Sequence, residues 1–193
     1  MRKAVFLISL ITSLIVVSTA AHPAELNLGP NNFTVKLDSI QFNDNALEDF
    51  NNAFFLGLEG YGDLGKNFYL GAEVGYVDKE VKTEIAGTQA NRELIFIPIE
   101  LNLKYTVKVV SRLIFDVGGG FSYNYSREKI SGAGESSTVN EWLWGGQGFI
   151  DLNYKVEQFF LGANLKYQLT KNGRDLGHNF DNLRVGGQIG VIF

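Results

Sequence analysis

The chain contains no cysteine, only three prolines and only two histidines among its 193 residues. The absence of cysteine rules out disulfides, thiolate chemistry and cysteine-ligated zinc or iron–sulfur sites. Acidic residues outnumber basic ones and the formal net charge is −4, so binding to nucleic acid by counterion release is not expected. What the chain does have is 22 glycines and an aromatic content of 13%, which together favour regular β-strands over helices.

The first 20 residues have the three-part layout of a secretory signal peptide. Arg2 and Lys3 precede an apolar run over residues 4–17, and small residues follow up to Ala21. The run is too short to span a bilayer comfortably as a helix. The small-x-small rule predicts cleavage after Ala20, with Ala21 or Ala24 as alternatives, so that residues 21–193 form one exported domain.

Most of the remaining sequence divides into segments in which apolar and polar residues alternate with a period of two, which is typical of β-strands. Seven segments are clear: 52–62, 68–82, 93–106, 112–127, 141–154, 159–170 and 182–193. Residues 33–42 form a weaker eighth candidate, because the apolar side of this segment switches near Asp38. Whether residues 33–42 form the first strand is left open by the sequence.

The connections between these segments alternate in length, which is a signal independent of hydrophobicity. Residues 63–67, 107–111 and 155–158 are tight turns, whereas residues 43–51, 83–92, 128–140 and 171–181 are longer and polar. Up-and-down barrels of outer membranes have short periplasmic turns and longer outer loops. The sequence therefore predicts an all-β fold, an eight-stranded antiparallel up-and-down transmembrane β-barrel.

The two faces of the predicted strands differ sharply in polarity. One face carries Leu, Ile, Val and aromatic residues without an interrupting charge, as expected for contact with lipid, where a midplane Arg or Lys costs about 2–4 kcal/mol. The other face combines glycines with charged residues that are predicted to form a polar network in the lumen: Glu59, Glu73, Glu100, Lys104, Asp116, Asp151, Lys166 and Arg184. These five acidic and three basic side chains have a formal charge of −2.

A soluble barrel or sandwich, with the apolar face inside, is the alternative that alternation alone does not exclude. The interior of an eight-stranded barrel holds too few side chains to accept all of these large apolar residues. Aromatic residues also gather near the predicted strand ends, where two membrane interfaces would lie. Pro98 falls in mid-strand and cannot donate to the ladder, so we expect a bulge or a local gap there.

The last segment reads Val-Gly-Gly-Gln-Ile-Gly-Val-Ile-Phe over residues 185–193. It resembles the C-terminal signature that the barrel-assembly machinery recognises, carried here by Ile189, Val191 and Phe193. With residues 68–76 and 97–105, it makes the exported domain similar to the outer-membrane β-barrel domain family often labelled porin-like, and similar in plan to the transmembrane domain of outer-membrane protein A. The resemblance implies a location in the cell outer membrane, contact with its lipid including lipopolysaccharide, and biogenesis through periplasmic chaperones and the assembly machinery.

Few residues suggest catalysis, and no cofactor or metal is expected. Some eight-stranded outer-membrane barrels modify lipid A, but a triad needs a histidine base beside a nucleophile, and only His22 and His178 are available, without a serine close to His178 in sequence. The run Gly118-Gly119-Gly120 lies inside a predicted strand and lacks the helix and lysine of a phosphate loop. These glycines are interpreted as relief of crowding inside the barrel.

Three functions therefore remain, in decreasing order of support. The first is a structural or surface-interaction barrel, whose lumen is plugged by polar side chains and whose outer loops 83–92, 128–140 and 171–181 meet surface ligands of unspecified identity. The second is a narrow, cation-preferring channel for small solutes. The third is a lipid A-modifying enzyme, which would depend on His178.

Overall fold

The computed structural model describes residues 31–85, 88–132 and 135–193. The predicted signal peptide, with the cleavage site at Ala20, lies outside the described residues. Eight strands and one short 3-10 helix make up the fold: β1 (Asn32–Phe42), η1 (Asn45–Phe50), β2 (Ala53–Gly65), β3 (Phe68–Ile85), β4 (Thr88–Val110), β5 (Leu113–Gly132), β6 (Glu135–Val156), β7 (Phe159–Thr170) and β8 (Asn182–Ile192).

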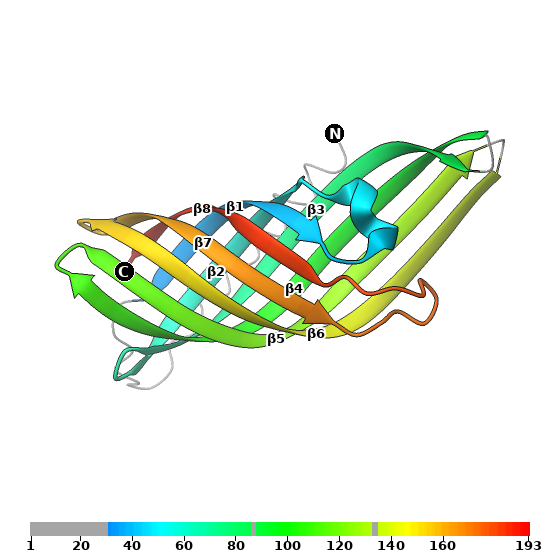
Figure 1. Ribbon diagram of the computed structural model, residues 1–193. Helices are drawn as coiled ribbons and strands as arrows, with labels where there is room; N and C mark the ends of the chain where they lie inside the picture. Colours follow the sequence, from blue (N-terminus) through cyan, green and yellow to red (C-terminus); the bar gives the residue numbers. More distant parts are fainter. Residues whose placement is uncertain (1–30, 86–87, 133–134) are drawn as a thin grey trace.

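The strands form one closed antiparallel barrel in which each strand pairs with the next and β8 pairs with β1 (Figure 1). The predicted fold class is confirmed, and residues 33–42 do lie in the first strand. Tight turns join β2 to β3, β4 to β5 and β6 to β7 at one end, which we call the turn end. The opposite end carries η1 and residues 171–181, and we call it the loop end. No helix among the described residues is long and apolar enough to cross a membrane.

Four strands extend farther at the loop end than the sequence predicted. The segments 83–92 and 128–140, expected to be loops, are largely strand: the β3–β4 ladder continues to Ile85 and Thr88, and the β5–β6 ladder to Gly132 and Glu135. In Figure 1 these strand ends project to the right, past η1. The prediction was wrong because lipid-driven alternation ends at the membrane interface, whereas backbone pairing continues beyond it.

The exterior of the barrel is apolar between its two ends. Phe54 is 77% exposed and Phe121 is 74% exposed, although burial in a protein core is normal for phenylalanine. Aromatic rings cluster on this exterior near the loop end, where Tyr123 stacks on Trp142 at 4.7 Å between ring centroids. A second aromatic pair, Phe68 and Tyr105, lies toward the turn end at 5.0 Å. Two aromatic belts around an apolar band match the two interfaces of a bilayer.

Two inward glycines make room for large rings inside the barrel. A Cβ atom at Gly75 would overlap the ring of Phe55, and one at Gly118 would overlap the ring of Phe149. A Cβ at Gly120 would meet the carbonyl oxygen of Leu101. The interpretation of Gly118 and Gly120 as relief of crowding is therefore confirmed. Gly119 points to the lipid side instead, opposite Gly148 of β6.

Pro98 interrupts the β3–β4 ladder without shifting its register. Pairing runs as far as Val74 with Ile99 and resumes at Val77 with Phe96, so the expected local gap is present. On its other side, Pro98 keeps its place opposite Asn124 of β5. The gap costs little because Pro98 has no N–H group to leave unpaired.

The lumen at the loop end is filled by a cluster of apolar side chains that the sequence analysis did not anticipate. Strand residues, η1 and the β7–β8 segment all contribute: Ile40, Phe42, Leu47, Phe50, Ala53, Phe55, Val77, Leu94, Phe96, Leu143 and Phe180. Phe96 and Phe180 stack with their ring centroids 5.3 Å apart. We call this group the apolar cluster.

The apolar cluster explains why β1 has apolar residues on both of its faces. Lys36 and Asp38 point into the lumen, and so do Ile40 and Phe42 two and four residues later. The strand does not change its orientation. What changes along its length is the content of the lumen, from polar to apolar.

Candidate functional site: the charged lumen

Three carboxylates lie side by side on one wall of the lumen, near mid-height of the barrel. Glu59 on β2 is paired directly with Glu73 on β3, and Glu73 is paired directly with Glu100 on β4. All three side chains are buried, with at most 2% of each residue exposed. Like charges placed directly opposite each other repel, so this row requires cations nearby.

Three cations reach this row, one from the adjacent strand β1 and two from β7 and β8 across the lumen. Lys36 on β1 lies 2.8 Å from Glu59 and 3.3 Å from Glu73. Lys166 on β7 bridges Glu73 and Glu100, the latter at 2.6 Å, and Arg184 on β8 binds the same two carboxylates. Because each cation contacts two carboxylates, the six groups form one network, which we call the central network.

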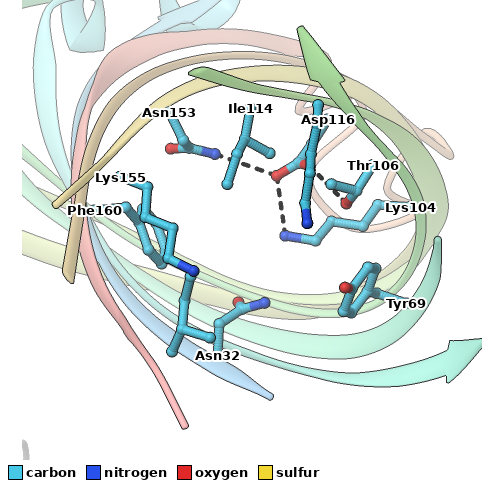
Figure 2. Close-up of a pocket in the computed structure, with 11 residues that line it drawn as sticks. Asn32, Tyr69, Lys104, Thr106, Ile114, Asp116, Asn153, Lys155 and Phe160 are labelled. Carbon is cyan, nitrogen blue, oxygen red and sulfur yellow. Dashed lines mark hydrogen bonds and ion pairs between the residues drawn. The ribbon is translucent and has the colours of Figure 1, made fainter. Parts of the chain in front are cut away.

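A second polar layer lies toward the turn end and is organised by Asp116 on β5. Its carboxylate accepts hydrogen bonds from Lys104 Nζ at 3.2 Å, Thr106 Oγ1 at 2.7 Å and Asn153 Nδ2 at 3.2 Å (Figure 2). Asn153 in turn accepts from Gln188 Nε2 at 2.7 Å. Lys104 also lies over the ring of Tyr61, 4.0 Å from its centroid, so its position is well defined.

A third layer of uncharged polar side chains separates the central network from the apolar cluster. Gln168 Nε2 donates to Ser122 Oγ at 2.9 Å and to Asn124 Oδ1 at 3.2 Å. Asn182 Nδ2 donates to Gln168 Oε1 at 3.0 Å, and Asn124 Nδ2 donates to the carbonyl of Leu143 at 3.1 Å. Going from the turn end to the loop end, the lumen thus changes from charged to amide-rich to apolar.

The structure brings most of the predicted lumen residues together. Glu59, Glu73, Glu100, Lys166 and Arg184 share the central network, and Lys104 pairs with Asp116. Asp151 faces the lumen as predicted and is 2% exposed, but neither of its carboxylate oxygens has a hydrogen-bond partner among the described residues.

Two charged lumen residues, Lys36 and Asp38, were missed. Both are buried on β1, where Asp38 Oδ1 accepts from Asn164 Nδ2 at 2.9 Å. The strict parity of residues 33–38 could have revealed them. Because one is a cation and the other an anion, adding them to the eight predicted residues leaves the formal charge of that group at −2.

Comparisons with known proteins found no matching family model and no matching curated protein, but they found similar solved structures. The attachment invasion locus protein Ail of Yersinia pestis has a TM-score of 0.56 at 9% identity, over 84% of this chain and 99% of that one. Neisserial surface protein A has a TM-score of 0.55 at 11% identity, over 85% of this chain and 96% of that one. The N-terminal β-barrel domain of OprF from Pseudomonas aeruginosa has a TM-score of 0.50 at 16% identity, over 86% and 99%.

The fold is that of the small outer-membrane β-barrels. Each of these likenesses covers nearly the whole of the other chain, so they concern the complete barrel. At such low identities they establish the fold and leave the contacts inside this barrel to be interpreted from its own residues.

At the loop end of the barrel, Glu128 of β5 contacts a histidine and an arginine. His178 Nε2 lies 2.7 Å from Glu128 Oε1, and Arg92 of β4 lies 3.6 Å from Glu128 Oε2. Arg92 also pairs with Asp49 of η1 at 3.5 Å and lies over the ring of Phe50. The hydrogen bond with Glu128 raises the pKa of His178 above its usual value, although partial burial acts in the opposite direction.

The segment 171–181 is fixed to the barrel by a second carboxylate. Glu141 of β6 accepts hydrogen bonds from the backbone N–H groups of Arg174 at 2.6 Å and Asp175 at 3.2 Å. Asp181 accepts from the N–H of Thr170 at 2.6 Å, which closes the base of the segment. The segment is therefore fixed over the loop end of the lumen, where its own Phe180 joins the apolar cluster.

Two residues of the predicted assembly signal, Ile189 and Val191, lie on β8, and Phe193 follows directly after its last residue. Ile189 and Phe193 are 56% and 67% exposed on the exterior, and Val191 lies between them in the same orientation. Within the described part of the chain, no group of three or more His, Cys, Asp or Glu side chains could hold a metal ion.

Proposed function

We propose that this protein is an integral outer-membrane barrel that acts through its loop end at the cell surface and whose lumen is closed to solutes. This proposal rests on four consecutive strands, β3 to β6, which extend farther at the loop end than the other four strands do. β7 ends at Thr170, opposite Gly145, so that β6 continues from there toward the loop end paired only with β5, and its other edge has no strand partner among the described residues. A bare strand edge is a template for an extended segment of another chain.

The two edges of the extended sheet differ in charge. The β3 edge, residues 79–85, reads Lys-Glu-Val-Lys-Thr-Glu-Ile, and alternating charges of this kind discourage strand addition. The β6 edge, residues 136–140, reads Ser-Ser-Thr-Val-Asn and carries no charge. We therefore assign the β6 edge as the surface that binds an extended peptide of a partner protein.

Two paired serines provide a matched test of this edge. Ser131 on β5 and Ser136 on β6 are directly opposite each other, with their hydroxyls 3.4 Å apart. S136K places a cation on the edge strand, and S131K places the same cation on the adjacent inner strand. We expect cells that display the wild-type barrel or S131K to adhere to an epithelial monolayer above the level of empty cells, and S136K to abolish the gain. Equal adhesion by S136K and wild type would refute an edge-dependent role.

The apolar cluster supports the proposal of a closed lumen. It fills the lumen at the loop end, next to the layer of uncharged polar side chains, and each of its residues is at most 4% exposed. The runner-up function, a small-solute channel, requires an aqueous path past Phe96 and Phe180. Planar-bilayer recording of the refolded barrel tests this directly, and we expect no discrete conductance steps. Discrete conductance steps in the wild type would contradict the closed lumen and favour the channel hypothesis.

An enzymatic role is not part of the proposal. His178 Nε2 is used by Glu128, and the ring also interacts with the backbone of Leu176. A histidine held in this way serves to fix residues 171–181. We expect that expression of the barrel leaves the structure of lipid A unchanged. Lipid A that is altered by the wild type but not by H178Q would restore the enzyme hypothesis.

For biogenesis and surroundings, we propose that lipid including lipopolysaccharide covers the apolar exterior, and that Ile189, Val191 and Phe193 engage the assembly machinery after chaperones deliver the chain. The exposed, outward positions of Ile189 and Phe193 support this, because a partner can reach them before lipid does. An I189N/F193N variant should accumulate unfolded in the periplasm while refolding normally in detergent.

A further inference from the structure

A hollow of about 110 Å³ lies inside the barrel mouth at the turn end (Figure 2). It is separate from the central network and from the loop-end surface proposed above. Its lining combines three lysines, Lys104, Lys108 and Lys155, with a single carboxylate, Asp116. Figure 2 shows Lys104 and Lys155 reaching toward the open centre from different sides.

The charges around the hollow are not balanced. Asp116 is already fully used, because it accepts from Lys104, Thr106 and Asn153. Lys108 and Lys155 have no ion-pair partner among the described residues. Two lysines therefore line a small cavity without forming an ion pair with a described carboxylate.

The surroundings strengthen the attraction for an anion. Ile114, Phe160 and Ile192 form apolar parts of the wall, and low-dielectric walls focus the field of nearby charges. Lys104 is 6% exposed and is held by Asp116 and by the ring of Tyr61, so its ammonium group is preorganised. A preorganised ammonium group binds an oxyanion more strongly than a mobile surface lysine does.

We propose that this hollow binds a small, doubly charged oxyanion of the phosphate class. Charge favours a dianion, because two lysines are left over after Lys104 and Asp116 are paired. A hollow of about 110 Å³ is large enough to hold a free oxyanion of this size.

The same phosphate chemistry could come from inorganic phosphate or from a lipid headgroup. The hollow lies within the barrel mouth and is lined by inward side chains, whereas lipid headgroups surround the exterior. Binding of free phosphate is therefore the expected case. The experiment separates the two sources by comparing barrel refolded in an uncharged detergent with barrel in nanodiscs that contain phosphatidylglycerol.

The test is calorimetric titration of the refolded full-length mature barrel with inorganic phosphate, with chloride adjusted to hold the ionic strength constant. Wild type should bind one phosphate per barrel in detergent. K155Q and K108Q should each weaken binding about tenfold, as expected for loss of one charge-assisted contact. K66Q is the matched control, because Lys66 lies in the exposed β2–β3 turn at the same end and outside the hollow, and its affinity should equal that of wild type.

Three results would overturn the proposal. They are the absence of saturable binding to wild type in detergent, an affinity that K66Q lowers as much as K155Q and K108Q do, and binding that occurs only to barrels in phosphatidylglycerol nanodiscs. Heat-dependent gel mobility of each variant shows that it is folded before titration. Because Lys108 is exposed at the mouth, K108Q keeps the test valid even if K155Q folds poorly.

Discussion

Arg184 on β8 forms an ion pair with Glu100 on β4, on the other side of the lumen. Both side chains are fully buried, and each also contacts a further member of the central network. The strands that carry them are not neighbours in the barrel. The pair therefore joins two walls that backbone hydrogen bonds alone do not connect.

Removing one partner of this pair should destabilise the barrel severely. R184M leaves Glu100 buried with less compensation, and loss of one partner of a buried pair costs about 3–5 kcal/mol. The free energy of unfolding in urea, measured for the barrel in vesicles, should fall by this amount in R184M. The double variant R184M/E100Q should lose clearly less than the sum of the two single variants, and simple additivity would contradict a direct coupling.

The pairing of His178 with Glu128 should make loop-end stability depend on pH. Because the pKa of His178 is raised in the folded state, its contribution is complete below the pKa of the unfolded chain, about 6.5, and is lost as pH rises through the higher folded pKa. Protease cleavage within residues 171–181 should therefore accelerate between pH 6 and pH 8.5 in wild type. In H178Q the rate, corrected for the pH dependence of the protease, should stay constant, and the same acceleration in H178Q would rule out the histidine.

Replacing Phe180 by alanine should destabilise the apolar cluster and leave the polar layers toward the turn end intact. Phe180 is fully buried and stacks on Phe96, and Phe→Ala in a packed core costs about 3–5 kcal/mol. F121A is the control, because Phe121 is 74% exposed on the exterior and leaves no internal cavity. Unfolding free energies that fall equally in F180A and F121A would show that the loop-end lumen is not packed.

A charge on the exterior should be tolerated only outside the apolar band. Leu101 is 56% exposed on the lipid side of β4, and L101R should cost about 2–4 kcal/mol near the midplane. T138R adds the same side chain on the exposed extension of β6 and should cost close to nothing. The folded fraction in vesicles, read by gel mobility, measures the difference, and equal folding would contradict a lipid-facing Leu101.

The inward glycines should resist even the smallest side chain. A Cβ at Gly75 would overlap the ring of Phe55 and lie 3.0 Å from Pro98 Cγ, so G75A forces the fully buried Phe55 ring to move. Overpacking of this kind typically costs about 1–3 kcal/mol. Adding F55L should recover part of the loss by removing the overlapping ring, whereas G62A at an open outward position serves as the neutral control.

The membrane-facing half of the fold was predictable because lipid imposes one simple rule on every outward side chain. The outward parity of β4 and β7 follows from it residue by residue, and so does the inward parity of Glu73, Lys166 and Arg184. The rule also located seven strands and the tight turns. It could not say which inward charges meet, because that depends on register and on side chains from opposite walls.

Two features escaped the sequence for physical reasons. The extensions of β3 to β6 lie beyond the lipid, where alternation is no longer enforced and polar residues resemble a loop. The apolar cluster escaped because inward Ile40 and Phe42 look like outward residues of a strand with the opposite parity. In both cases the solvent next to the strand changes along its length, while the strand itself continues.

The central network also has a mechanical consequence. Lys166 and Arg184 tie β7 and β8 to the carboxylates of β3 and β4 across the lumen, and Lys36 ties β1 to its neighbour β2 and to β3. Flattening the barrel at this height would require breaking ion pairs, so lateral pressure from the membrane should leave the cross-section round there. The lumen at the loop end is filled by apolar side chains, which form no ion pairs across the barrel. Its cross-section can therefore adjust when a partner binds at the loop end.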